Sequence, residues 1–112
     1  MSDPEGYWEL HAEFCKCLAH PVRLRILDAL GKGERSFGEL EKITGQSKVN
    51  LSRHLTLLAD RGVVRRRREG RRVHLSLANP KILRAYGLMT EAMSDSLERE
   101  LAAIGERGGE RG

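Results

Sequence analysis

The sequence is poor in aromatic residues and lacks long apolar stretches. Phe, Trp and Tyr together make up 4% of the 112 residues. No apolar run approaches the roughly 20 residues that a membrane-spanning helix needs, so no membrane partner is expected. Stacking on the bases of single-stranded nucleic acid is also disfavoured, because no aromatic residues are interleaved with the basic ones. Since the first residues are acidic and no apolar leader follows them, we expect a cytoplasmic protein.

Motifs of catalysis are missing as well. The sequence contains neither a G-x-S-x-G motif nor a Walker phosphate loop, and its carboxylates are scattered along charged stretches. We therefore do not expect an enzyme. Cysteine is scarce, with only Cys15 and Cys17 present. In a cytosolic chain such thiols are more often reduced, metal-binding or redox-active than a structural disulfide.

The basic residues are concentrated in one part of the chain. The formal net charge is +4, from 20 Lys and Arg against 16 Asp and Glu. Residues 1–14 carry four acidic residues and no Lys or Arg, whereas residues 63–77 carry six arginines and one glutamate. An anionic ligand is therefore expected to bind the arginine-rich part.

A helix-turn-helix pattern precedes that part. Ser36 followed by Glu39 is the signature of a capping box, and it predicts a short helix with Leu40 and Ile43 facing inward. The glycine that comes next should end this helix, because glycine tolerates the left-handed conformation of a helix end. Ser47 can then cap a second helix.

The second helix is expected to be a recognition helix. Leu51, Leu55 and Leu58 recur at helical spacing and predict one buried stripe. The opposite face is polar and suits the major groove of duplex DNA, where Arg, Ser and Thr bond base edges or phosphates and valine can touch a thymine methyl. An ordinary solvated helix face is the alternative. The predicted DNA contacts of this helix are Lys48, Val49, Asn50, Ser52, Arg53 and Thr56.

An arginine-rich hairpin is predicted next. Val73, Leu75 and Leu77 alternate with polar residues, and Glu69-Gly70 can form a two-residue turn. Arginines that face each other across a strand pair repel, but a nearby phosphate backbone removes that penalty. A solvated charged hairpin is the alternative. The predicted DNA contacts of the hairpin are Arg66, Arg68, Arg71 and Arg72, with His74 near the DNA.

The first helix should carry an apolar face. We expect it to begin at Pro4 behind a cap at Asp3 or Ser2, and to end before His20-Pro21. The residues of the face are Tyr7, Trp8, His11, Phe14, Cys15 and Leu18. This face must be covered by the rest of the domain or by a second subunit. The helix that follows should bury Val22, Ile26, Leu27 and Leu30.

A long terminal helix should start after Asn79-Pro80 and reach about Ile104. Its apolar stripe has no later segment to cover it, so a dimer seam is expected, with packing on its own domain as the alternative. The predicted interface residues are Trp8, Tyr86, Met89, Met93 and Leu97, with Leu101 and Ile104 continuing the stripe. Residues 1–104 should form one domain, followed by a disordered tail over residues 105–112.

These elements together predict a mainly α fold with a small β-hairpin. The expected architecture is a winged helix-turn-helix that is dimeric through its N- and C-terminal helices. A two-fold dimer would place two recognition helices roughly 34 Å apart, which suits a near-palindromic operator in double-stranded DNA.

The chain also resembles a known family. The resemblance rests on AHPVRLRIL at residues 19–27, SRHL at 52–55 with the following Leu57-Leu58, GVV at 62–64 and the arginine-rich wing. With these motifs the chain is similar to the ArsR-type (ArsR/SmtB) family of bacterial and archaeal repressors, from about Phe14 to about Leu101. The resemblance implies a homodimeric winged-helix repressor that leaves its operator when an inducer, often a thiophilic metal ion, binds.

The inducer is expected to act at N-terminal thiols. Thiolates select soft ions and imidazoles bind zinc and its neighbours. His11 and Cys15 share one helix face, whereas Cys17 points about 200° away from Cys15 in an intact helix. The two thiols would therefore share an ion only if the helix frays or if each faces a different subunit. The predicted sensor residues are His11, Cys15, Cys17 and His20.

Two familiar sensor sites of the family have no counterpart here. Residues 37–43 contain no cysteine, and residues 80–104 contain no histidine. Some relatives use N-terminal cysteines for arsenite, cadmium or lead, and others sense oxidants or reactive sulfur through a cysteine pair. Two alternatives stay open: inert core cysteines with a non-thiol inducer or none, and a winged-helix protein-interaction module. Such a module would expose apolar residues on its recognition helix.

Overall fold

The computed structural model describes residues 4–110, with side chains described as far as residue 103. Its elements are α1 (Tyr7–Leu18), α2 (Pro21–Gly31), β1 (Arg35–Ser36), α3 (Phe37–Thr44), α4 (Lys48–Asp60), β2 (Val64–Glu69), β3 (Arg72–Leu77) and α5 (Lys81–Glu110). The chain divides after Pro80 into two units, of which the second is α5. Among the described residues, no helix has the length and apolar character to cross a membrane.

The helix-turn-helix forms as its local sequence predicts. Ser36 Oγ accepts from the Glu39 backbone N–H at 3.1 Å, and the Glu39 carboxylate accepts from the Ser36 N–H at 3.2 Å. This capping box starts α3, and Gly45 ends it in the left-handed region at φ 68°. Ser47 Oγ accepts from the Asn50 N–H at 3.2 Å and caps α4. Each of these bonds satisfies a helix-terminal donor that would otherwise be unpaired.

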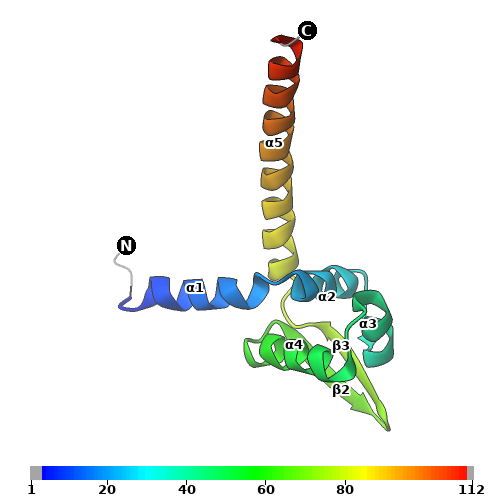
Figure 1. The fold of residues 1–112 in the computed structure, drawn as a ribbon. Coiled ribbons are helices and arrows are strands. Elements are labelled where there is room, and N and C mark those ends of the chain that lie inside the picture. The colour runs from blue at the N-terminus through cyan, green and yellow to red at the C-terminus, as the bar shows by residue number, and fades with distance from the viewer. Residues whose placement is uncertain (1–3, 111–112) are drawn as a thin grey trace. The chain divides into compact units, whose positions relative to one another are not determined.

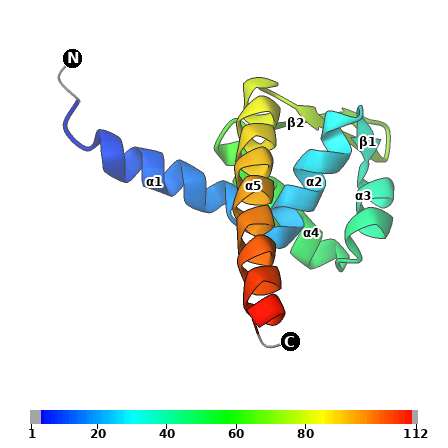
Figure 2. The ribbon, with the colours of Figure 1, turned by 90° about the horizontal axis from the view of Figure 1, so that it is seen from above.

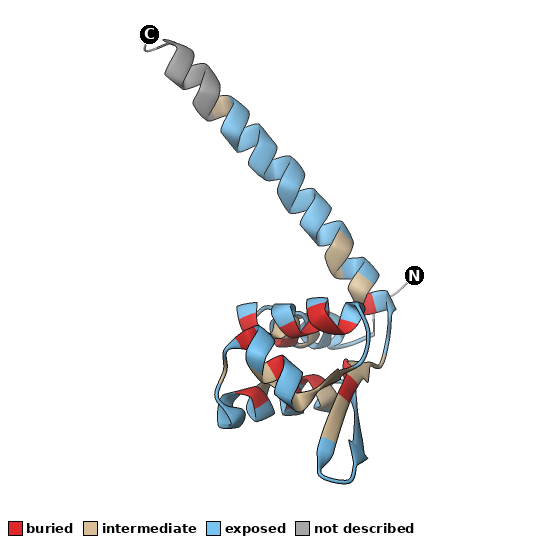
Figure 3. Ribbon diagram, turned by 90° about the vertical axis from the view of Figure 1, so that its right-hand side faces the viewer, coloured by how far each residue is buried: buried red, intermediate tan, exposed pale blue. Residues whose placement is uncertain are grey.

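The core lies between α2, α3, α4 and the inner part of the sheet (Figure 3). Its most deeply buried side chains are Ile26, Leu27, Leu40, Leu51, Leu58, Val63 and Leu75. The predicted inner stripes of α2 and α4 are confirmed. The inward placement of Ile43 is wrong, since 45% of this residue is exposed. Thr44 is buried in its place, and its hydroxyl donates to the Leu40 carbonyl at 2.7 Å, which satisfies the polar group inside the core.

The wing is a three-stranded antiparallel sheet in the order β1-β3-β2. The short strand β1, which the sequence did not predict, pairs Arg35 with Leu75. Glu69 pairs with Arg72, so the two-residue turn is Gly70-Arg71 and the predicted Glu69-Gly70 turn is wrong by one residue. Gly70 has φ 61° and Arg71 a negative φ, which puts glycine where the turn requires a positive φ.

Helix α1 starts later than predicted. It begins at Tyr7 behind Gly6, whose φ is 79°, and not at Pro4; the expected caps Ser2 and Asp3 lie outside the described residues. The Tyr7 N–H bonds the Pro4 carbonyl at 3.1 Å, so a turn precedes the helix. Glycine is a poor helix former, which explains why the helix starts beyond it. Figures 1 and 2 show α1 leading away from α2, α3 and α4, with only its C-terminal end beside them.

Helix α5 begins directly after Pro80 and continues to Glu110, past the predicted end near Ile104. Residues 105–110, predicted to belong to a disordered tail, are part of this helix, whereas the side chain of Ile104 and residues 111–112 lie outside the described part. Met89, Met93, Leu97 and Leu101 are each more than half exposed. The predicted apolar stripe is thus present on the surface of this helix.

Candidate nucleic-acid interface

Helix α4 presents the polar face that its periodicity predicts. Arg53 and Thr56 are exposed near the side opposite the buried leucines, Ser52 is exposed to one side of them, and 62% of Val49 is exposed. Asn50 is also exposed in the first turn. This arrangement offers hydroxyls, a guanidinium and one apolar contact along one helix face, which suits the edges of bases in a major groove.

Lys48 has a partner within the helix-turn-helix. Its ammonium lies 3.1 and 3.3 Å from the two carboxylate oxygens of Glu41 on α3. The Lys48 side chain is 79% exposed, so solvent weakens this pair and the lysine stays accessible to an anion. Lys48 therefore joins the two helices in the free protein and remains at the edge of the polar face.

The register of the wing divides its arginines between two faces. Successive side chains of a strand point to opposite sides. Arg66 and Arg68, opposite Leu75 and Val73, share one face, whereas the neighbouring strand positions share the other. In the register of β2 with β3, no arginine lies opposite another arginine. The like-charge repulsion expected from the sequence is therefore avoided by the pairing itself, and it cannot argue for phosphate.

A hydrogen bond joins the wing to the recognition helix. Nη2 of Arg66 donates to Thr56 Oγ1 at 2.8 Å. Because Arg68 follows on the same face of β2, the polar face of α4 continues into the arginines of the wing. We call this surface the α4–wing face and define it by Ser52, Arg53, Thr56, Arg66 and Arg68. It brings together predicted contacts from both elements.

The opposite face of the wing carries carboxylates. Arg67 donates to Glu34 at 2.7 Å and to Glu69 at 2.9 Å. These hydrogen bonds raise the pKa of Arg67, with that to Glu34 the larger cause, and the Arg67 bond lowers the pKa of Glu69. His74, predicted to lie near DNA, is on this face, 3.8 Å from Glu34 and 3.5 Å from Glu69. Arg72 pairs with Glu69 across the strands, and Arg71 is exposed in the turn.

The predicted sensor residues do not gather at one point. Helix α1 is intact to Leu18, so Cys15 is exposed while Cys17 is buried. His11 is exposed and packs its ring 5.8 Å from that of Tyr7. In the part of the chain that the structure describes, no three Cys, His, Asp or Glu side chains are placed to hold one metal ion. The expectation that Cys15 could be a core residue is wrong, because Cys17 has that role.

Cys17 instead contacts the recognition helix. Its Sγ lies 3.7 Å from the Leu57 carbonyl oxygen of α4, to which it donates. Burial raises the pKa of this thiol, and the nearby charges of Arg23 and Arg61 oppose that effect. Glu13 of α1 lies 3.8 Å from Arg61 in the same region. The C-terminal end of α1 is thus held against the C-terminal half of α4.

Arg23 of α2 connects this helix to both α1 and α4, a role that no sequence pattern indicated. Its guanidinium donates to the carbonyl of Cys17 and, at 3.4 Å, to that of Lys16, which also accepts from the Ala19 N–H at the end of α1. It also lies 3.1 Å from His54 Nδ1 on α4. Because guanidinium only donates, this Nδ1 accepts and His54 is neutral. Burial, His20 and Arg23 all lower the pKa of His54.

His20 has a structural task. Its Nδ1 accepts from the Val22 N–H at 3.1 Å and caps α2, and its ring lies 4.6 Å from that of His54. Histidine is not among the common N-capping residues, so its capping role could not be predicted from the sequence. Only the order His20-Pro21 indicated a helix boundary here. His20 is therefore separated in its role from the cysteines with which the sequence grouped it.

Comparison with known proteins agrees with this geometry. A family model described as a helix-turn-helix domain matches residues 18–67. The chain is 37% identical over 103 residues to the HTH-type transcriptional regulator Rv0081 of Mycobacterium tuberculosis, covering 91% of this chain and 90% of the relative. The crystal structure of Rv0081 matches with a TM-score of 0.79 and covers 89% of this chain and 99% of that one.

Two further structures are similar at lower identity. The homodimeric winged helix-turn-helix DNA-binding domain of Mb0332 from Mycobacterium bovis is 31% identical, with a TM-score of 0.74 over 88% of this chain and 94% of that one. The AntR antimony-specific transcriptional repressor is 27% identical, with a TM-score of 0.72 over 85% of this chain and 86% of that one. The chain belongs to the ArsR-type family of winged helix-turn-helix, DNA-binding transcription regulators, as its motifs predict.

Proposed function

We propose that the protein is a homodimeric repressor that binds a near-palindromic operator through the α4–wing face. The observation that carries this proposal is the 2.8 Å bond between Arg66 and Thr56, which joins the exposed side of the recognition helix to the wing. Helix α4 supplies the groups for base edges, and the wing supplies guanidinium groups for phosphates. Arg53 is the contact on α4 best suited to a guanine, since guanidinium can bond its O6 and N7 together.

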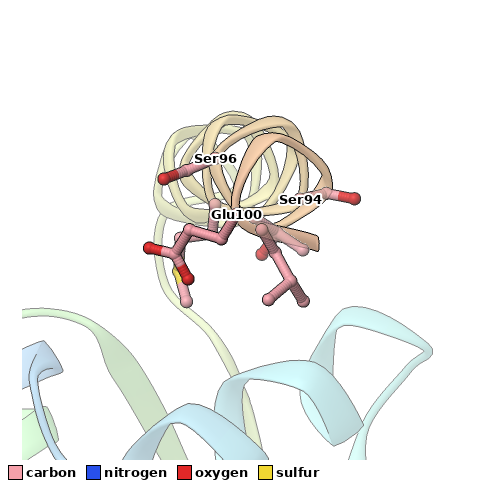
Figure 4. Close-up of a pocket in the computed structure, with 6 residues that line it drawn as sticks. Ser94, Ser96 and Glu100 are labelled. Carbon is pink, nitrogen blue, oxygen red and sulfur yellow. The ribbon is translucent and has the colours of Figure 1, made fainter. Parts of the chain in front are cut away.

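The apolar stripe of α5 supports the homodimer. Met93 and Leu97 lie on this stripe and are 64% and 55% exposed. Figure 4 shows Ser94 and Ser96 on opposite sides of α5, where they flank the stripe, whereas Glu100 projects between them at helical spacing with Met93 and Leu97. An apolar core with a polar rim is the usual composition of a protein interface. The homodimeric Mb0332 domain lends further support.

Aromatic residues of α1 form a second candidate contact surface of the proposed dimer. Trp8 is 63% exposed, and its ring packs edge-on against that of Tyr7 at 4.9 Å. Large exposed aromatic side chains are costly to leave in water and are enriched in interfaces. A second subunit is the occupant that fits, because two subunits are also what a near-palindromic operator requires.

The inducer, in this proposal, acts at the thiol of Cys17. This thiol bonds the Leu57 carbonyl of the recognition helix, so any adduct on the sulfur must displace the end of α1 from α4. Support also comes from the similar repressor AntR, which is described as antimony-specific. Antimony, like other soft ions and metalloids, prefers thiolate ligands. A coupling of about 1–3 kcal/mol between the two sites changes operator affinity by roughly 5- to 150-fold.

The chemistry of the inducer is divided between two classes. A soft metal or metalloid needs several donors, so it would have to draw Cys15 or a group of a second subunit toward Cys17. An oxidant or reactive sulfur species needs only one thiolate, so it requires no second donor beside Cys17. The alternative is that both cysteines are inert and that the inducer binds elsewhere or is absent.

Fluorescence anisotropy tests the proposal directly. The reduced protein is titrated onto a duplex selected from a randomised library, then exposed to arsenite, cadmium, zinc or a persulfide. We expect release by one of these, no release in the Cys17→Ser variant, and DNA affinity that survives this substitution. Release that persists in the Cys15→Ser, Cys17→Ser double variant contradicts the thiol mechanism. If no duplex binds above the salt-sensitive non-specific background, DNA binding itself is contradicted and the protein-interaction module is favoured.

A further inference from the structure

We propose that Arg67 is a positioning residue of the wing and not a DNA contact. Its partners Glu34 and Glu69 would then act with it as a brace that fixes the hairpin for binding by Arg66 and Arg68. This inference rests on the proposed function, because the wing has to bind DNA for its position to matter.

The brace spans the sheet from one edge to the other. Glu34 immediately precedes β1, whereas Arg67 belongs to β2, and β3 lies between these two strands. The 2.7 Å bond from Arg67 to Glu34 therefore crosses β3, where His74 lies 3.8 Å from the same carboxylate oxygen. A two-stranded hairpin has little packing of its own to hold its angle. A bond across the whole sheet supplies such a restraint.

Arg67 is also the wing arginine whose charge is most directly compensated. It bonds two different carboxylates through two different nitrogens, at 2.7 and 2.9 Å. Glu34 and Glu69 offset the charges of Arg67 and of Arg72, which pairs with Glu69 across the strands, so this cluster offers phosphate no net positive charge. Arg66 differs, because its partner is the neutral hydroxyl of Thr56 and its full charge remains available.

The two faces of β2 therefore carry different tasks. The strand places Arg66 and Arg68 on the α4–wing face and Arg67 on the face of His74. If phosphates lie against the α4–wing face, Arg67 points away from them. The sequence-based prediction names Arg66 and Arg68 among the four consecutive arginines at 65–68, but no local pattern indicates the carboxylate partners of Arg67.

The salt dependence of binding separates a phosphate-binding residue from a positioning residue. Log K falls as log salt rises, and removing a side chain that neutralises one phosphate makes this negative slope less steep by about 0.9. We would measure that slope on the selected duplex for Arg67→Gln, with Arg66→Gln and Arg68→Gln as matched controls on the other face. In the two control variants the slope should become less steep. Arg67→Gln should leave the slope unchanged and weaken binding about two- to five-fold, the range of an exposed ion-pair network.

Glu34→Gln provides a second test, because the two possible roles of Glu34 predict opposite changes in DNA affinity. Removing a negative charge beside DNA should tighten binding if Glu34 acts only through its charge. If it braces the wing, binding should weaken about two- to five-fold, as for Arg67→Gln. The double variant should bind no more weakly than Arg67→Gln alone, because both substitutions remove the same charge-assisted bond.

Three results overturn the inference: a reduced slope for Arg67→Gln, an unchanged affinity for Arg67→Gln, or tighter binding by Glu34→Gln. Failure of the proposed function looks different. In that case the wild-type protein itself shows no specific binding, and Arg66→Gln changes nothing.

Discussion

Cys15 and Cys17 differ in their surroundings although only one residue separates them. Burial raises the pKa of Cys17, so the folded chain favours the protonated thiol. Its contribution to stability is present below the pKa of the unfolded chain and is lost as pH rises through the higher folded value. Because only the thiolate reacts, alkylation of Cys17 should also require a higher pH in the folded protein than in the unfolded one.

Iodoacetamide labelling of the Cys15→Ser variant checks this prediction. The rate is followed against pH in native buffer and again in urea, which serves as the control for the same thiol without burial. We expect the native profile to be displaced toward higher pH and to be slower throughout. Superimposable profiles, or a displacement toward lower pH, would show that Arg23 and Arg61 outweigh burial at this sulfur.

His54 should make the fold sensitive to acid. Its folded pKa is lowered, first by burial and then by His20 and Arg23, so the unfolded chain binds a proton more readily. The stability that its neutral form contributes is present above the unfolded pKa and is lost as pH falls through the folded value. Protonation also removes the acceptor that Arg23 uses. We expect the urea concentration at the unfolding midpoint of the wild type to decrease as the pH is lowered from about 7.5 to 5.5.

A pair of variants isolates this residue. In His54→Asn an amide oxygen can replace Nδ1 as the acceptor without titrating, so the loss of stability on acidification should become smaller. His11→Asn, on the exposed face of α1, should keep the wild-type dependence. Equal pH dependence in wild type and His54→Asn would assign the acid sensitivity to other groups.

Among the elements, α3 depends on its cap. It is only 8 residues long, and its first turn is held by the reciprocal bonds of Ser36 and Glu39. Ser36→Ala removes the acceptor for the Glu39 N–H and should lower the free energy of unfolding by about 1 kcal/mol. Chemical denaturation measures the change. Ser52→Ala, an exposed serine inside α4, is the control and should cost nothing, since alanine is the better helix former there.

An element could be predicted from the sequence when the interactions that define it join residues close together in the chain. Ser36, Glu39 and Gly45 act within a few residues, so the limits of α3 could be read directly. The register of the wing joins Arg35 to Leu75, far along the chain, and depends on packing that no local pattern records. The unpredicted strand β1 and the one-residue shift of the turn both have this origin.

The candidate site divides in the same way. The polar face of α4 follows from helical periodicity and was predicted residue by residue. Arg66 and Arg68 were predicted as contacts, whereas the role of Arg67 depends on Glu34, which approaches it only in the folded sheet and which no local pattern indicates. Helical periodicity predicted that an intact helix turns Cys15 and Cys17 to different sides, as is found, but nothing in the sequence indicated that the side chain of His20 caps α2.

At the scale of the whole molecule, the exposed stripe of α5 must find a partner if the protein is to bind two half-sites together. Joining two binding modules strengthens binding by about 10²- to 10⁴-fold over one module, because the second binding event becomes intramolecular. Loss of the dimer should therefore appear as a loss of operator affinity even though the α4–wing face is untouched.

Met93→Glu tests this relation, because it places a charge within the stripe where Met93 is 64% exposed in the single chain. Sedimentation equilibrium should show a monomer, circular dichroism a folded domain, and anisotropy an operator affinity weakened at least about a hundredfold. Ala102→Glu is the matched control, since it introduces the same charge at an exposed position on the opposite side of α5. It should remain dimeric and bind as the wild type does. A dimeric Met93→Glu protein would move the seam away from α5, whereas a monomer with undiminished affinity would show that one recognition helix and one wing suffice.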